Sequence, residues 1–336
     1  MEILQRIGVS PKTIAHGLLP LVLAALLASS ACGGGEPTLA GSSLPAPSVS
    51  GVIVFVNAVQ PGTMLSTAAP LCSGNGDIYV VNADGSGRRA LAEAPSWAEH
   101  PSWSPDASRI VWATCSAAGE SGADATLWVM NADGSDKRPL AEDLHGDWAV
   151  WSPDGTQVAF SRCGEQVGDQ EICVIGADGS GLRELTQGCG DVAPAWGPDG
   201  RIYFLRGSSI YAMSADGSGV TQVTKGYDIA DFGLSPDGKT LAIHDSANDR
   251  ILAVAVDGSG SPTTLLDRPS RYLDPEGRLG TKWAPAWTPD GKALVLTTDL
   301  QYSLHGTRLY VVNAVGSGLS AVPGIENAID AAWRPE

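Results

Sequence analysis

Acidic residues and one histidine stand at or near the start of several short apolar segments of this chain. The set comprises Glu99, His100, Asp147, Asp191, Asp231 and Asp330. If the segments are neighbouring strands that begin at one edge, these side chains converge. Converging carboxylates suit a cation, with Ca²⁺ as the candidate metal, or a basic peptide segment. The alternative is that they cap turns and face solvent.

Tryptophans offer a second kind of contact. Trp97, Trp148 and Trp283 lie outside the repeated tryptophan position, near the predicted loops, and are candidates for stacking on a ligand. Five others recur at one position of a repeat and are expected to pack in the core: Trp103, Trp151, Trp196, Trp287 and Trp333.

Catalytic motifs are poorly represented. The sequence has no H-E-x-x-H and no G-x-S-x-G. "GLSPDGKT" (233–240) matches the spelling of a phosphate loop, but a strand is expected after it, where phosphate binding needs a helix N-terminus. We therefore expect no catalysis. The weaker alternative is a lyase or hydrolase site around His100 and Asp231.

Two interleaved repeats predict the elements that position these residues. Segments of the "WSPD" type begin at 103, 151, 196, 234, 287 and 333, and segments of the "NADGSG" type begin at 82, 131, 176, 214, 255 and 313. The apolar runs between them, bounded by Gly, Pro and Asp, are typical of strands. Four strands per unit predict an all-β, six-bladed propeller with four-stranded antiparallel blades.

This pair of motifs resembles the repeats of the TolB-like β-propeller family. The resemblance covers 51–336 and implies a closed propeller that serves mostly as a binding platform, fused in some members to an enzyme. TolB itself carries an additional N-terminal domain, where we expect only a tether in this chain.

The two ends of the propeller complement each other. The chain ends at "AIDAAWRPE", an inner strand without a second strand, and the propeller opens at "GVIVFVN", a second strand without a first. We predict that 329–333 is the inner strand of a blade completed by 51–56, 77–82 and 88–91. This pairing closes the ring and leaves no long exposed edge.

The two faces of the disc are expected to differ. Both repeated turns fall on one face, the turn face, and the long insertions fall on the other, the long-loop face: 57–75, 114–125, 162–170, 267–282 and 298–307. Function is expected on the long-loop face. The repeated turn carboxylates are expected to serve turn geometry: Asp106, Asp154, Asp199, Asp237 and Asp290.

The cysteines of the propeller are candidates for disulfides because the chain is expected to be exported. They are Cys72, Cys115, Cys163, Cys173 and Cys189. We expect Cys72 to pair with Cys115, and Cys163 to pair with Cys173 or Cys189.

Residues 1–31 have the pattern of an export signal, with Arg6 and Lys12 before the apolar run "GLLPLVLAALLA". "ASSACGGGE" resembles a bacterial lipoprotein box, which predicts lipidation of Cys32 and a flexible tether over 32–50. The alternative is cleavage near Ala31 and a soluble secreted protein. The net charge of −16 speaks against nucleic acid as a partner.

These observations predict a monomeric binding scaffold of the cell envelope, in the periplasm or at the cell surface. A lipid anchor would be its only membrane contact, and the propeller over 51–336 would present its long-loop face to a protein or peptide partner. The alternative is a carbohydrate or small-molecule binding propeller. No organic cofactor is expected.

Overall fold

The computed structural model covers residues 1–336. It describes 49–59, 75–92, 97–115, 126–141, 144–163, 170–188, 190–267, 282–299, 309–325 and 328–335. The chain divides into two compact units, Met1–Ser42 and Ser43–Glu336, and all described residues belong to the second. In these ranges no helix has the length and apolar character needed to cross a bilayer.

The second unit consists of six four-stranded antiparallel sheets, as predicted. The inner strands are β24 (Ala328–Trp333), β4 (Trp97–Trp103), β8 (Gly146–Trp151), β12 (Asp191–Trp196), β16 (Ile229–Leu234) and β20 (Lys282–Trp287). The second strands are β1 (Val52–Val59), β5 (Arg109–Cys115), β9 (Gln157–Cys163), β13 (Arg201–Arg206), β17 (Thr240–Asp245) and β21 (Ala293–Asp299).

The third strands are β2 (Asn75–Asn82), β6 (Thr126–Asn131), β10 (Gln170–Gly176), β14 (Ser209–Ser214), β18 (Arg250–Ala255) and β22 (Tyr310–Asn313). The outer strands are β3 (Arg89–Ala92), β7 (Arg138–Pro139), β11 (Arg183–Glu184), β15 (Thr221–Gln222), β19 (Thr263–Asp267) and β23 (Ser320–Ala321). A short 3₁₀ helix, η3 (Ser246–Asn248), joins β17 to β18.

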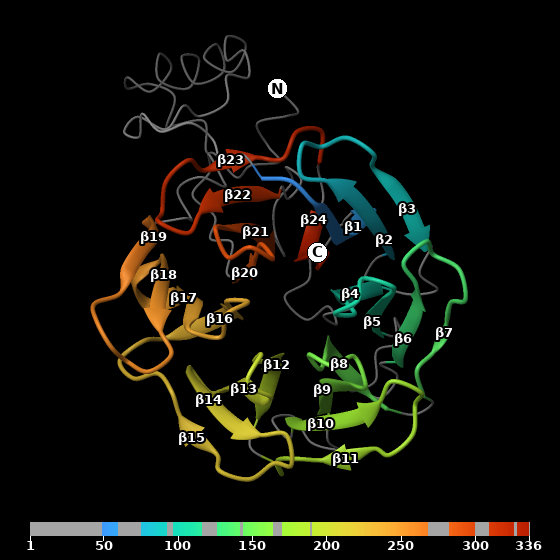
Figure 1. Ribbon diagram of the computed structural model, residues 1–336, viewed down its shortest axis with the longest axis horizontal. Coiled ribbons are helices and arrows are strands. Elements are labelled where there is room, and N and C mark those ends of the chain that lie inside the picture. The colour runs from blue at the N-terminus through green and yellow to red at the C-terminus, as the bar shows by residue number, and fades with distance from the viewer. Residues whose placement is uncertain are drawn as a thin grey trace, which may run out of the picture. The chain divides into compact units, whose positions relative to one another are not determined.

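We number the blades from the closing one. Blade 1 is β24 with β1–β3, and blades 2 to 6 follow in chain order from β4–β7 to β20–β23. Each blade contacts the next, and blade 6 returns to blade 1 through β21 and β24. Figure 1 shows the resulting ring with the inner strands around its centre.

Blade 1 closes the ring in the predicted way. β24 pairs antiparallel with β1, which brings Trp333 opposite Ile53 and Ala328 opposite Asn57. The last strand of the chain is therefore the inner strand of the blade that the first strand begins.

The core lies in the seams between blades. The described residues form six hydrophobic clusters, each built from two neighbouring blades. In β5, for example, Val111 packs toward blade 3 and Trp112 toward blade 1. Second strands are buried on both faces, which is why their sequences are continuous apolar runs rather than alternating ones.

The repeated tryptophans pack in these seams. Trp103 and Trp333 are each 6% exposed, and Trp151 is 5% exposed. The indole N–H of Trp151 donates to the carbonyl of Ser102 in the preceding blade (3.3 Å), and Trp287 donates in the same way to Gly233 (3.0 Å). The predicted core role is confirmed for Trp103, Trp151 and Trp333, whereas Trp196 and Trp287 are half-buried and pack against the margins of their seams.

The "SPDG" carboxylates shape their own turns. The Oδ1 of Asp154 accepts from Ser152 Oγ (2.6 Å) and from the Thr156 amide (3.0 Å). Asp106, Asp237 and Asp290 accept the equivalent pair of hydrogen bonds, and Asp199 accepts the amide bond from Arg201. Because these bonds stabilise the charged form, the pKa of Asp154 is lowered. The turn role is confirmed.

The "ADGSG" turn also joins neighbouring blades. Gly179 has a φ of +86°, and a Cβ atom there would lie 2.2 Å from the backbone oxygen of Leu140 in blade 2. A Cβ atom at Gly134 would lie 2.5 Å from the backbone oxygen of Leu91 in blade 1. The glycines of this motif therefore allow close packing between neighbouring blades in addition to forming the turn.

The chain enters the propeller on the turn face. Residues Val49–Val52 line a cavity together with Asp106 of blade 2 and Asp290 of blade 6, both of which belong to turns that follow inner strands. The start of β1 therefore lies on the side where the inner strands end.

One position of the inner strands has unusual backbone geometry. His100, Trp148, Ala193 and Asp330 have φ values of +50°, +52°, +53° and +46°, and each precedes the last Trp of its strand by three residues. The pairing register with the second strand shifts around each of them. Such a β-bulge redirects the side chain.

Candidate functional site

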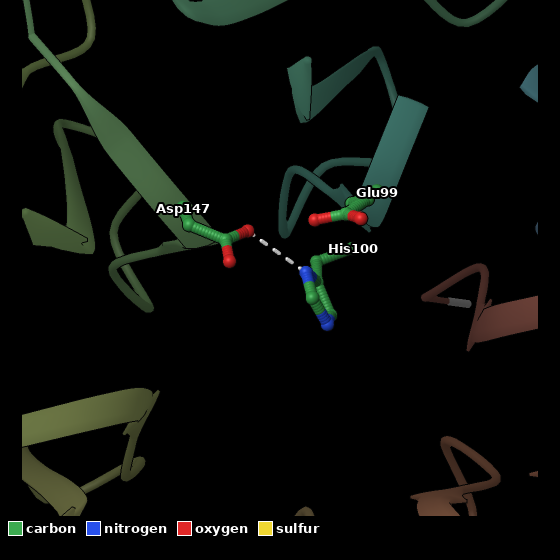
Figure 2. A group of neighbouring side chains, drawn as sticks. All are labelled: Glu99, His100 and Asp147. Atoms are coloured by element: carbon green, nitrogen blue, oxygen red, sulfur yellow. Dashed lines mark hydrogen bonds and ion pairs between the residues drawn. The ribbon is translucent and has the colours of Figure 1, made fainter. Parts of the chain in front are cut away.

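The bulged position brings side chains from three neighbouring blades together. Asp330 belongs to blade 1, Glu99 and His100 to blade 2, and Asp147 and Trp148 to blade 3. We call these five residues the central cluster. Figure 2 shows Glu99, His100 and Asp147 pointing toward one another.

His100 is held between two carboxylates. Its Nδ1 lies 2.9 Å from Asp147 Oδ1, and its Nε2 lies 3.8 Å from Asp330 Oδ1. The backbone amide of His100 donates to Asp330 Oδ2 (3.2 Å). The side chains are half-buried, with exposed fractions of 22% for His100, 24% for Asp147 and 17% for Asp330.

Trp148 covers the ring of His100. The two ring centroids are 4.4 Å apart, with 33° between the planes. The amide of Trp148 donates to Asp147 Oδ1 (2.7 Å), so the same carboxylate fixes both the bulge and the histidine. The predicted stacking residue Trp148 is therefore part of the acidic cluster rather than a separate platform.

The cluster keeps His100 protonated. Burial alone would lower the pKa of the imidazole, but the charges of Asp330 and Asp147, the hydrogen bond to Asp147 and the charge of Glu99 outweigh it and raise the pKa to about 10. Both ring nitrogens then act as donors. Among the described residues, the carboxylates of Glu99, Asp147 and Asp330 lie around this ring.

The cluster could bind a cation, with limits on which kind. One ligand atom each from Glu99, His100 and Asp147 lies within 4.8 Å of the others. A transition metal would have to displace the proton of His100, which the raised pKa opposes. A hard cation such as Ca²⁺ would use the carboxylate oxygens only.

Two predicted members of the site have other contacts. Asp191 is fully buried, and both its oxygens accept from Arg206, its partner across the β12–β13 ladder (2.7 and 2.8 Å). Asp191 is thus already used within blade 4, and we exclude it from the candidate site. Asp231 has the same strand position as His100, and its Oδ1 accepts from the Phe232 amide (2.6 Å).

Several other predicted residues lie outside the part of the chain that the structure describes. This holds for Cys32, Cys72 and Cys189, and for the side chains of Trp97, Trp283, Cys115 and Cys163. Most residues of the predicted long loops lie there too. The Cys72–Cys115 and Cys163–Cys189 pairings therefore stay predictions.

Cys173 is a correction to the predicted disulfides. It is a free thiol with no exposed surface, on β10 between Phe160 of β9 and Glu184 of β11. Burial raises the pKa of its thiol to about 12. The alternative that pairs Cys173 with Cys163 is thus absent from this structure, because a side chain in the middle of the sheet points into a packed seam.

A buried histidine was missed by the sequence reasoning. His244 on β17 is 3% exposed, and its Nδ1 has no hydrogen-bond partner among the described residues. Burial lowers its pKa. Its place in the apolar strand "TLAIHD" was the available signal, since strand residues between buried neighbours are themselves expected to be buried.

Comparison with known proteins supports the architecture. The model of the TolB beta propeller domain matches residues 142–336. A search of curated proteins finds no significant match to the sequence.

Solved structures show the same fold. TolB from Acinetobacter baumannii superposes with a TM-score of 0.65 at 18% identity, over 85% of this chain and 67% of that one. A putative TolB from Agrobacterium tumefaciens gives 0.56 at 18% identity, over 83% and 91%. A chain of a nidogen/laminin complex gives 0.62 at 12% identity, over 84% and 98%.

At these identities the superpositions show the fold alone. The family model, in contrast, matches more than half of the chain and includes four complete blades. This chain therefore belongs to the TolB β-propeller domain family.

Proposed function

We propose that this protein is a binding scaffold of the cell envelope, whose propeller receives a protein or peptide partner at the long-loop end of its central cluster. The observation that carries the proposal is the convergence of three carboxylates, those of Glu99, Asp147 and Asp330, from neighbouring blades among the described residues. A basic side chain of a partner is the complementary group.

Export and anchoring belong to the same proposal. Residues 1–31 would direct export, Cys32 would be lipidated, and 32–50 would tether the propeller; the sequence pattern of these residues is what supports this part of the proposal. Mass spectrometry of the protein from membranes would test this. A Cys32→Ser variant would have to lose the lipid adduct.

An acid–base enzyme is less well supported. His100 lies among carboxylates, as a catalytic histidine often does, but its raised pKa keeps it protonated at neutral pH. A general base works best with a pKa near the working pH. His100 would therefore be a poor base.

A carbohydrate site is the second candidate, favoured by Trp148. Sugars stack on exposed aromatic faces, and Trp148 is half-buried beside polar groups. One of its faces, however, is already turned toward His100.

Affinity capture from detergent-solubilised envelopes, with variant proteins in parallel, tests the main proposal. Glu99→Gln should weaken capture of the partner because it removes one central carboxylate. Asp136→Asn is the matched control, since Asp136 lies in a turn of blade 2 and its side chain is 68% exposed. Loss with Glu99→Gln alone supports the proposal. Equal capture by all three proteins, or recovery of a glycan instead of a protein, would contradict it.

A further inference from the structure

A second cavity opens in the seam between blades 1 and 2, on the turn face, and has a volume of about 120 Å³. Trp103 at the end of β4, Arg89 at the start of β3 and Arg334 directly after β24 line it, and we call it the seam pocket. The backbone amide of Arg334 donates to the Val52 carbonyl (2.8 Å), which holds this residue at the pocket. Among the described residues, the wall contains no carboxylate and no member of the central cluster.

The pocket borders a buried hydrogen-bond donor that lacks an acceptor. Trp103 is 6% exposed, and its indole nitrogen has no partner among the described residues. At the same position of blade 3, the nitrogen of Trp151 donates to the Ser102 carbonyl of the preceding blade. Trp196 and Trp333 lack a partner too, but neither lines this pocket. Because an unpaired buried N–H costs free energy, an acceptor within the pocket would be stabilised at Trp103.

The two arginines of the pocket are not neutralised by ion pairs within the described part of the chain. Arg334 lies over the indole of Trp103, with its guanidinium carbon 5.6 Å from the ring centroid. The carboxylate that senses Arg89 is that of Asp133, whose pKa is lowered mainly by hydrogen bonds from Ser135 and least by the charge of Arg89. Asp133 and Arg89 form no ion pair. Two guanidinium groups therefore flank the pocket of a protein whose net charge is −16.

We propose that the seam pocket binds a phosphate-sized oxyanion. Arg89 and Arg334 supply charge-assisted hydrogen bonds to its oxygens, and the indole N–H of Trp103 supplies a further donor. The small volume favours the free inorganic anion over a phosphate ester. The bound anion connects Arg334 of the closing blade with Trp103 of the next blade and so reinforces the closure of the ring. This site is independent of the proposed function, because it shares no residue with the central cluster.

NMR of the tryptophan indole N–H groups tests the site directly. Inorganic phosphate is titrated into the full-length protein at constant ionic strength, with chloride as the anion that it replaces. The signal of Trp103 is identified by its loss in Trp103→Phe, and it should shift saturably with phosphate. Glycerol 3-phosphate serves as the ester and should bind more weakly than inorganic phosphate.

Arginine variants show whether the shift reports binding in the pocket. Arg334→Gln and Arg89→Gln should each weaken phosphate binding about tenfold at low salt, because each removes one positive charge beside the anion. Arg201→Gln is the matched control, since Arg201 lies over the Tyr203 ring of blade 4 in a similar way, at 5.7 Å. Thermal unfolding checks that each variant is folded. Phosphate should also raise the Tm of the wild type more than that of Arg334→Gln.

The outcomes separate the possibilities. A saturable shift of the Trp103 signal that Arg334→Gln weakens and Arg201→Gln leaves unchanged supports the proposal. The absence of such a shift, or equal weakening by Arg334→Gln and Arg201→Gln, overturns it. Tighter binding of glycerol 3-phosphate than of inorganic phosphate would overturn the assignment to the free anion.

Discussion

At the scale of single residues, His100 gives the propeller a pH dependence in the alkaline range. Its pKa in the folded state is about 10, against an ordinary value of 6.5. A raised pKa means that the folded state holds the proton more tightly than the unfolded state. The stabilisation that protonated His100 provides is therefore complete below about pH 6.5 and is lost as the pH rises through 10. The free energy of unfolding should fall over this window.

The measurement is chemical denaturation of wild type and His100→Asn at pH 7 and pH 10. One pKa unit corresponds to about 1.4 kcal/mol, and we expect a loss of about 1–3 kcal/mol, since His100 is 22% exposed and solvent screens its charge. The stability difference between the two proteins should shrink at pH 10. A difference that stays constant would show that the imidazolium does not carry the effect.

His244 should have the opposite sign. Burial lowers its pKa, so the unfolded chain binds a proton that the folded protein rejects. Its contribution is present above the unfolded value of about 6.5 and is lost as pH falls below it. Wild type should therefore lose stability between pH 7 and pH 5 more steeply than His244→Leu. Parallel pH profiles would contradict the assignment.

The sequence predicts some members of the central cluster but not all of them. Glu99, Asp147 and Asp330 gather because the repeat places them at neighbouring positions of inner strands. Asp191 looked equivalent, but its pairing with Arg206 depends on the register of β12 with β13, which the motif spacing does not specify. The stacking of Trp148 on His100 needs two bulges, and a positive φ at a non-glycine residue leaves no mark in the sequence.

At the scale of elements, we predict that substitutions in the "ADGSG" turn, which joins the third strand of a blade to its outer strand, destabilise the protein more than the exposure of the turn suggests. Gly179→Ala would place a methyl group 2.2 Å from the backbone oxygen of Leu140 and would also strain a φ of +86°. Because a backbone oxygen cannot move aside cheaply, we expect a loss of about 2–4 kcal/mol in the free energy of unfolding.

Gly181→Ala in the same turn is the matched control. Its φ is +68°, but an added Cβ would meet nothing within 4 Å. It should cost only the strain of the left-handed conformation, about 1 kcal/mol. Equal losses for the two variants would mean that the contact between blades 2 and 3 is not what the glycine protects.

The second and third strands could be predicted from the sequence because the "SPDG" and "ADGSG" turns mark where they begin and end. Pro and Gly specify the first turn, and Asp bonds its own backbone in both turns. The outer strands were less defined. Several have only two residues, as in β7 and β11, because short edges leave little pattern to read.

At the scale of the whole molecule, closure depends on the last strand. Deleting 328–336 would remove β24 and expose the edge of β1, where Ile53, Val54 and Phe55 have no exposed surface. We expect a broad, less cooperative thermal transition at a lower Tm, because one seam then lacks its inner layer. Deleting only 334–336 keeps β24 and should have a much smaller effect. A sharp transition after the longer deletion would contradict the role of closure.

The position at which the chain enters the propeller, beside Val49, determines whether attachment through the N-terminal residues interferes with ligand binding. The cavity there is lined by turns at the ends of inner strands, whereas the central cluster lies toward their beginnings. Any attachment through the residues before Val49 would therefore pull on the turn face of the disc. Anchorage and ligand binding would then be independent events, and immobilising the protein by its N-terminal side should leave its affinity for a ligand unchanged.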